Sequence, residues 1–213
     1  MFLSLFQQNP SAAVAFLLGL VIGITLHEAA HATSAYLLGD DTAYRDGRVT
    51  LNPASHLDVL GSLMLLMAGF GWGKPTPVMP AKLRGGVLGP VAVALAGPIS
   101  NLVVVAICAA LFLLDVFRDP GGYLLILVVM VASTNALLFV FNLIPIPPLD
   151  GAKVLFPFLP RALDGFVDFM NQYGPFILLG LILVSFVTNL PILSILLAPV
   201  RPLLTFFGLP SIF

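Results

Sequence analysis

Hydrophobic residues form long runs along this chain, separated by short segments rich in glycine, proline and charged residues. The three longest runs are Ser11–Leu38, Val87–Phe117 and Tyr123–Phe141, and a further apolar stretch begins with Phe176–Val187. At about 1.5 Å per residue the first run gives a helix of about 42 Å, longer than the ~30 Å hydrocarbon core of a bilayer. The runs therefore predict helices that span a membrane.

The segments between the runs predict smaller elements. Val59–Phe70 is apolar but reaches only about 18 Å as a helix, which predicts a re-entrant segment that enters the membrane and returns. In 42–51, the dipeptide Asp46-Gly47 tolerates the positive φ angles of a type I′ turn and predicts a small β-hairpin. Short interfacial helices are expected over Ala152–Tyr173.

Composition places the chain among polytopic membrane proteins. Of 213 residues, 59% are hydrophobic and only 9% are charged, whereas a soluble domain carries about 25% charged residues. We expect a single all-α domain over 1–213, with a three-helix catalytic core in about 11–158 and additional C-terminal helices in 159–213. The net charge of −1 gives no basis for binding nucleic acid, and the single cysteine excludes an intrachain disulfide.

The distribution of basic residues predicts the orientation in the membrane. If Val59–Phe70 turns back, seven Lys and Arg residues share one side, against Arg118 and Arg201 on the other. The positive-inside rule assigns the richer side to the cytoplasm. We therefore expect a multi-pass protein of the cell membrane whose active site faces the cytoplasmic side. The seven residues are Arg45, Arg48, Lys74, Lys82, Arg84, Lys153 and Arg161.

An H-E-x-x-H motif lies within the first apolar run. His27 and His31 are four residues apart, so they lie one turn apart on one helical face, where two imidazoles can bind one metal ion. Glu28, the only glutamate of the chain, can take a proton from a water activated by that ion. Because ionisable side chains in hydrocarbon cost a few kcal/mol each, metal binding is favoured over chance.

A catalytic zinc site needs a third protein ligand. The sequence lacks a second glutamate, and Leu37 stands where a metzincin would carry its third histidine, so His56 or an aspartate remains. Asp150 follows the proline-rich segment 142–149, where freed backbone groups and a carboxylate can face a shielded cavity. It can equally be the N-cap of a helix that starts near Gly151. The residues alone leave both readings of Asp150 open.

Several motifs in order resemble the site-2 protease family of intramembrane zinc metalloproteases, in its small prokaryotic form without PDZ or CBS domains. The similarity covers roughly residues 11–158, and five motifs in order are more specific than H-E-x-x-H alone. The motifs are HEAAH at 27–31, LNPASH at 51–56, GWGKPTPV at 71–78, AGPISN at 96–101 and NLIPIPPLDG at 142–151.

The resemblance implies a function and a set of site residues. It implies His27, His31 and Asp150 as ligands of one zinc ion, Glu28 as general base, and Asn142 as a contact to substrate or to the developing oxyanion. The reaction implied is hydrolysis of peptide bonds in or near transmembrane segments, as in regulated intramembrane proteolysis. The partners would be a transmembrane substrate and the lipid bilayer. Independently of the resemblance, an open edge of the predicted hairpin suggests a place where an extended substrate can pair.

Three alternatives remain open from the sequence. Asn135, seven residues before Asn142, can belong to the polar lining of the site or make a hydrogen bond between helices. His56 can contact the site or support the hairpin. A membrane metal-ion transporter or permease can use the same His and Asp residues, although the sequence shows no repeated halves and no second set of ionisable residues along a pathway.

Overall fold

The computed structural model describes residues 7, 9–61, 64, 73–116, 122–188 and 190–210, and within them all regular elements are helical. No strand occurs in these residues, and a single isolated β-bridge joins Leu57 and Gly73. Four described helices are long and apolar enough to cross a bilayer, so the described chain has the all-helical architecture expected from the sequence. The α-helices are α2 (Pro10–Leu37), α3 (Thr42–Arg45), α5 (Leu88–Leu113), α6 (Tyr123–Asn142), α7 (Asp150–Leu155), α8 (Asp164–Thr188), α9 (Ile192–Leu196) and α10 (Val200–Phe206), and short 3-10 helices cover Pro53–Ser55, Pro80–Lys82, Phe156–Phe158 and Arg161–Leu163.

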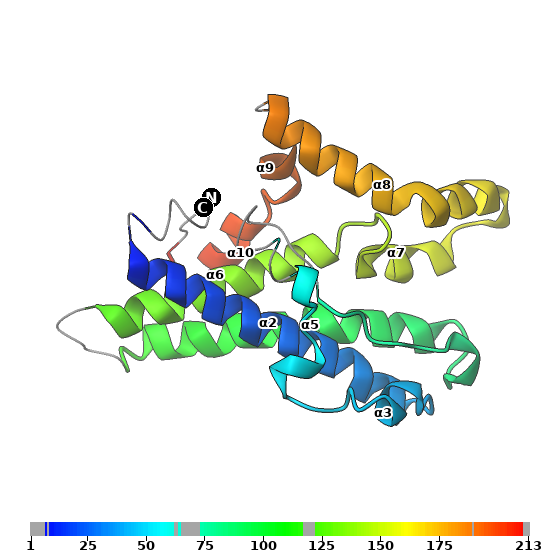
Figure 1. Cartoon of the computed structure of the whole chain (residues 1–213), viewed down its shortest axis with the longest axis horizontal. Coiled ribbons are helices and arrows are strands. Elements are labelled where there is room, and N and C mark those ends of the chain that lie inside the picture. The colour runs from blue at the N-terminus through cyan, green and yellow to red at the C-terminus, as the bar shows by residue number, and fades with distance from the viewer. Residues whose placement is uncertain are drawn as a thin grey trace.

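Helices α2, α5 and α6 lie side by side and form the centre of the molecule (Figure 1). Small residues bring α2 close to α6: a Cβ added at Gly19 would lie 3.1 Å from the Val131 Cα, and one added at Gly23 would lie 2.9 Å from the Asn135 Oδ1. A second contact surface joins α5 and α6 to α10 through a cluster of buried aliphatic side chains that includes Val105, Ala132 and Leu204. Close backbone approach through small residues is typical of helix packing in membranes.

The C-terminal part differs from the short interfacial helices expected over Ala152–Tyr173. Short helices do cover 150–163, but α8 starts at Asp164 and continues without a break to Thr188. Pro175 lies inside α8 and does not end it, although a proline removes one backbone hydrogen bond. Leu178 and Ile182 of α8 pack on the loop that follows α6, and this packing supports the helix past the proline. In Figure 1, α8 lies above the central helices, on the side where α7 is also found.

The β-hairpin predicted for 42–51 is wrong. Thr42–Arg45 is the short helix α3, and Asp46-Gly47 ends it. The Gly47 amide donates to the Tyr44 carbonyl at 3.0 Å and the Arg48 amide to the Ala43 carbonyl at 2.9 Å, with Gly47 at φ 68°. This is a Schellman helix end, in which glycine takes the left-handed position just past the last turn. Asp-Gly is common both in type I′ hairpin turns and at helix ends. The hairpin turn would need positive φ at both residues, whereas the helix end found here needs it only at Gly47.

An extended segment, residues 73–84, which we call the strap, crosses the C-terminal end of α2. Buried Asp40 accepts from the Met79 amide at 2.6 Å, and buried Arg48 donates from Nη1 to the Lys74 carbonyl at 3.2 Å. The Arg84 amide donates to the Leu38 carbonyl at 2.9 Å. Burial opposes ionisation of Asp40, yet hydrogen bonds from Thr42 and the Met79 amide, with the charge of Lys82, hold the pKa of its carboxyl below the usual value.

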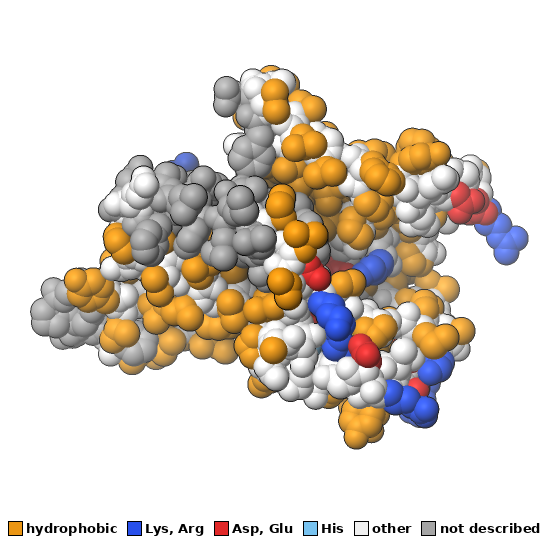
Figure 2. Space-filling view, in the orientation of Figure 1, with side chains coloured by type: hydrophobic (Ala, Val, Ile, Leu, Met, Phe, Trp, Pro, Cys, Tyr) orange, Lys and Arg blue, Asp and Glu red, His pale blue; other side chains and the backbone are white. Residues whose placement is uncertain are grey.

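The contact between Leu38 and Arg84 places the start and the end of the connection from α2 to α5 at the same end of the helices. The predicted re-entrant segment, Val59–Phe70, lies within that connection and falls mostly outside the described residues. Figure 2 shows hydrophobic side chains over the flanks of the molecule, whereas most of the visible Lys and Arg side chains lie toward its right-hand end, around α3 and the strap.

Candidate metal centre

Three side chains from α2 and α7 meet inside the molecule. His27 Nε2 lies 3.0 Å and His31 Nε2 lies 3.1 Å from the same oxygen, Oδ2 of Asp150, and the two Nε2 atoms are 3.0 Å apart. All three side chains are buried. Two donors bound at about 2.0–2.1 Å to a tetrahedral zinc ion lie about 3.3 Å apart, close to these separations. The three side chains could hold a metal ion.

The hydrogen-bond partners of Nδ1 in both imidazoles leave each Nε2 free to bind a cation. His27 Nδ1 lies 2.7 Å from Oδ1 of Asn101, and His31 Nδ1 lies 2.7 Å from the Val93 carbonyl oxygen. Both partners are acceptors, so each imidazole carries its proton on Nδ1 and directs the lone pair of Nε2 inward. Two lone pairs and a carboxylate oxygen then face one another within 3.1 Å. A cation between them removes the repulsion, so the residues fit zinc.

The second oxygen of Asp150 is held by Lys153. Lys153 Nζ lies 2.9 Å from Asp150 Oδ1, one turn further along α7. Asp150 is the first residue of α7, and Leu149 occupies the N-cap position without a side-chain cap. The carboxylate therefore faces the two histidines and does not cap α7.

Gly97 of α5 faces the same two imidazoles. A Cβ added at this position would lie 2.6 Å from His27 Nε2 and would also overlap His31 Nε2. Real Cβ atoms do not approach other heavy atoms this closely, so only glycine leaves the inner nitrogens free without a shift of the helices. The close approach of α5 to α2 is thus part of the site.

Glu28 is held by the strap. Thr76 donates to Glu28 Oε2 from its backbone amide at 2.9 Å and from its hydroxyl at 2.7 Å. Both bonds reach the same oxygen, so Glu28 Oε1 keeps its lone pairs for another partner. The strap therefore fixes the orientation of the carboxylate that neighbours His27 in the sequence.

The resemblance implies that Glu28 is the general base of a zinc protease, and on this basis Thr76→Val is expected to lower peptide cleavage about tenfold and to leave zinc content unchanged. The substitution removes the hydroxyl donor, keeps the amide donor and has nearly the same volume. A hydrogen bond to a charged group contributes about 1.5–3 kcal/mol, of which the amide retains a share. The measurement is kcat for peptide cleavage by the purified protein. Thr76→Ser should restore it, Thr205→Val in α10 should not change it, and wild-type kcat in Thr76→Val would refute the role.

The remaining predicted residues have these positions. Asn142, the last residue of α6, donates from Nδ2 to the Leu138 carbonyl of its own helix at 2.9 Å. Asn135 is fully buried and accepts from Asn101 Nδ2 at 2.9 Å, so it does make a hydrogen bond between helices. His56 is fully buried outside the group of three, and its Nε2 lies 2.8 Å from the Thr50 carbonyl oxygen.

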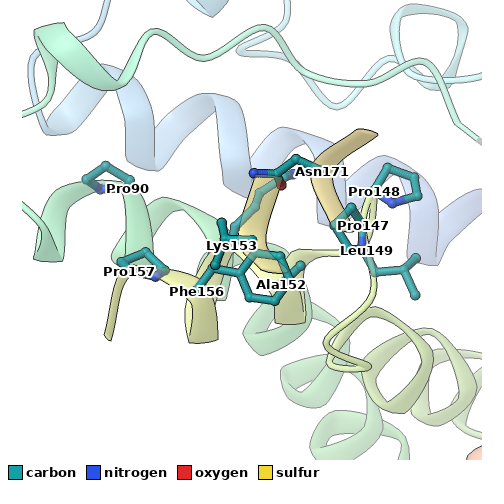
Figure 3. A pocket seen from close by; sticks show the side chains of 10 residues that line it. Pro90, Pro147, Pro148, Leu149, Ala152, Lys153, Phe156, Pro157 and Asn171 are labelled. Carbon is teal, nitrogen blue, oxygen red and sulfur yellow. The ribbon is translucent and has the colours of Figure 1, made fainter. Parts of the chain in front are cut away.

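A cleft of about 420 Å³ opens next to Asp150, between α7, α8 and the N-terminal part of α5 (Figure 3). Its walls are mainly apolar, and Lys153 and Asn171 add polar groups. Because Lys153 lines the cleft and its Nζ lies 2.9 Å from Asp150 Oδ1, the cleft adjoins the metal centre. The lining residues are Pro90, Pro147, Pro148, Leu149, Ala152, Lys153, Phe156, Pro157, Val167 and Asn171.

Asn101 and Thr76 are among the contributors to the site that were not predicted as such from the sequence. Asn101 was included only within the AGPISN motif, and Thr76 only within GWGKPTPV. A signal for Asn101 does exist, since it is a strongly polar side chain within the apolar helix Leu88–Leu113, and such residues usually face a partner. Thr76 has no comparable signal, because its partner Glu28 lies 48 residues earlier.

Comparison with known proteins shows relatives of one kind. A protein of Bacillus subtilis (strain 168) named "Putative zinc metalloprotease YwhC" is 38% identical over 179 residues, which cover 80% of this chain and 79% of that protein. "Putative zinc metalloprotease Rip2" of Mycolicibacterium smegmatis is 30% identical over 176 residues, covering 78% and 65%. "Putative zinc metalloprotease MJ0611" of Methanocaldococcus jannaschii is 41% identical over 63 residues. No protein-family model and no solved structure matches the chain.

The names of these relatives are consistent with the metal ion that the candidate site could hold. Proteins named as zinc metalloproteases imply zinc, and His27, His31 and Asp150 form a group that fits this ion. The apolar helices and the relatives together indicate a metalloprotease of a membrane. With 38% identity over most of both chains, this protein belongs to the site-2 protease family of zinc metalloproteases.

Proposed function

We propose that the protein is an intramembrane endoprotease, which hydrolyses peptide bonds in or near transmembrane segments of other membrane proteins, as in regulated intramembrane proteolysis. The observation that carries this proposal is the convergence of His27, His31 and Asp150 at 3.0–3.1 Å beside α2, a helix long and apolar enough to span the bilayer. A metal centre at this depth is surrounded by hydrocarbon. Water and the substrate peptide can reach it only through a cavity that the protein shields from lipid.

In the proposed reaction His27, His31 and Asp150 hold one zinc ion per chain, which supplies Lewis-acid polarisation of a water molecule and of the scissile carbonyl. Glu28 Oε1 accepts a proton from the attacking water while Thr76 holds Oε2. Glu28 then returns that proton to the amine of the leaving peptide. Asn142 is proposed to donate to the developing oxyanion through the second N–H of its amide, since the first donates to the Leu138 carbonyl.

The substrate has to present an extended backbone to these residues. A transmembrane helix uses its carbonyls in its own hydrogen bonds, so it must unwind locally before cleavage. The cleft lined by Pro147, Pro148 and Phe156 adjoins Asp150, and its mainly apolar walls suit the side chains of such a segment. We propose that this cleft receives part of the unwound substrate.

We also propose that the site faces the cytoplasmic side of the cell membrane. Support comes from the basic residues Arg45, Lys82 and Arg84, which lie near the C-terminal end of α2, beside α3 and the strap. His31 lies within about two turns of this end of α2. The contact between Leu38 and Arg84 also places both ends of the connection from α2 to α5 at this end of the helices.

The test uses the purified protein in detergent with a set of labelled single-span membrane peptides and an unfolded soluble protein. We expect cleavage of at least one single-span peptide, loss of cleavage after zinc is removed with a chelator, and recovery when zinc is added back. Zinc-dependent cleavage of the soluble protein alone would overturn the intramembrane assignment. Zinc flux into proteoliposomes without cleavage would instead indicate a transporter.

A further inference from the structure

A line of buried amides runs from α6 through α5 to His27. Asn135 Oδ1 accepts from Asn101 Nδ2 at 2.9 Å, and Asn101 Oδ1 lies 2.7 Å from His27 Nδ1. Both asparagines are fully buried. Buried amides in membrane helices need partners, and each of these has several within hydrogen-bond distance.

The direction of every bond in this line is set by backbone carbonyls, which can only accept. Asn135 Nδ2 donates to the Val131 carbonyl at 2.9 Å, so its Oδ1 has to face Asn101. Asn101 Nδ2 also donates to the Gly23 carbonyl at 3.1 Å, so its Oδ1 has to face His27. An oxygen at this position requires the His27 proton on Nδ1.

We infer that Asn101 and Asn135 are positioning residues for zinc binding: they fix the tautomer and the ring orientation of His27 so that its Nε2 lone pair faces the metal site. Partners behind a histidine ligand commonly change metal affinity by about 10–100-fold. The two histidines are not equivalent in this respect. His31 uses the Val93 backbone carbonyl, which no side-chain substitution removes, whereas His27 depends on two side chains.

This inference rests on the proposed zinc site, and the experiment separates the two. Zinc affinity is measured by competition with a chelator, and the visible spectrum of the cobalt-substituted protein reports the coordination geometry. The variants are Asn101→Leu, Asn135→Leu and the double variant. Asn101→Ala removes the same hydrogen-bonding groups and carries the test if the leucine variant does not fold. Ser133→Ala on α6 and Val105→Ala on α5 are controls, since both are buried and no hydrogen bond joins either side chain to His27.

We expect Asn101→Leu to weaken zinc binding about 10–100-fold and to change the cobalt spectrum. Asn135→Leu should weaken binding less than Asn101→Leu, and should have no further effect when Asn101 is already replaced, because it acts through that residue. The controls should change thermal stability only. Wild-type zinc affinity in Asn101→Leu, or equal effects of Asn135→Leu in both backgrounds, would overturn the inference. A wild-type protein that binds no zinc would overturn the zinc site itself.

Discussion

The Glu28→Gln variant is expected to have a kcat for peptide cleavage about 1,000-fold lower than the wild type and an unchanged zinc content. General acid–base catalysis by one positioned group contributes about 10²–10⁴-fold, and an amide cannot accept the proton of the attacking water. The glutamine oxygen can still accept from the amide and hydroxyl of Thr76, so the strap stays in place. The carboxylate of Glu28 is not among the three converging side chains, so zinc content should not change.

The measurement pairs cleavage of a single-span peptide with metal analysis of the same preparation. Asp168→Asn is the matched control, because it makes the same carboxylate-to-amide change on the exposed surface of α8. Retained zinc with lost cleavage separates the role of Glu28 in proton transfer from a role in binding the metal. Unchanged kcat in Glu28→Gln would remove this residue from the mechanism.

Gly97→Ala is expected to weaken zinc binding by about 100-fold and, with it, to abolish activity. The added methyl group would lie 2.6 Å from His27 Nε2 and would overlap His31, so either the imidazoles rotate or α5 moves away from α2. Overpacking of this kind costs about 1–3 kcal/mol, and a tenfold change in affinity corresponds to about 1.4 kcal/mol. Alanine favours helix more than glycine does, so α5 itself should not weaken.

Gly180→Ala tests whether a methyl group on any helical glycine has this effect. Gly180 lies within α8, and an added Cβ there meets no atom within 4 Å. We expect this variant to bind zinc like the wild type, with equal or higher thermal stability. Zinc affinity measured by chelator competition decides the comparison. If Gly97→Ala binds zinc as tightly as the wild type, the glycine is not needed to keep the two nitrogens free.

The long helices could be predicted because each has many apolar residues. The helix predicted over Ser11–Leu38 is observed as Pro10–Leu37, and the helix predicted over Tyr123–Phe141 is observed as Tyr123–Asn142. Such runs need no tertiary contact to be recognised, since hydrocarbon requires backbone groups to bond within the helix. The short elements could not be predicted in this way, because their structure depends on tertiary contacts. Asp46-Gly47 suits both a hairpin turn and a helix end, and the packing of α3 on α2, with Tyr44 stacked on Tyr36, decides between them.

In the candidate site, too, local helix geometry could be predicted from the sequence, and contacts between distant segments could not. The spacing of His27 and His31 predicts a shared face from helix geometry alone, and the structure places both imidazoles against one oxygen of Asp150. The sequence left Asp150 between a metal-binding and a capping role, because that choice depends on how the loop after α6 folds back. The contribution of Asn101 depends on the rotation of α5 about its own axis, which only packing against α2 and α6 determines.

The group of three joins residues that are far apart in the order of synthesis. His27 precedes Asp150 by 123 positions, and α5 and α6 are made between them. During insertion into the bilayer, α2 therefore enters with two imidazoles that lack their carboxylate partner and their supporting amides. All three side chains are present only after α7 has been made, so a chain that ends before α7 lacks the complete metal centre.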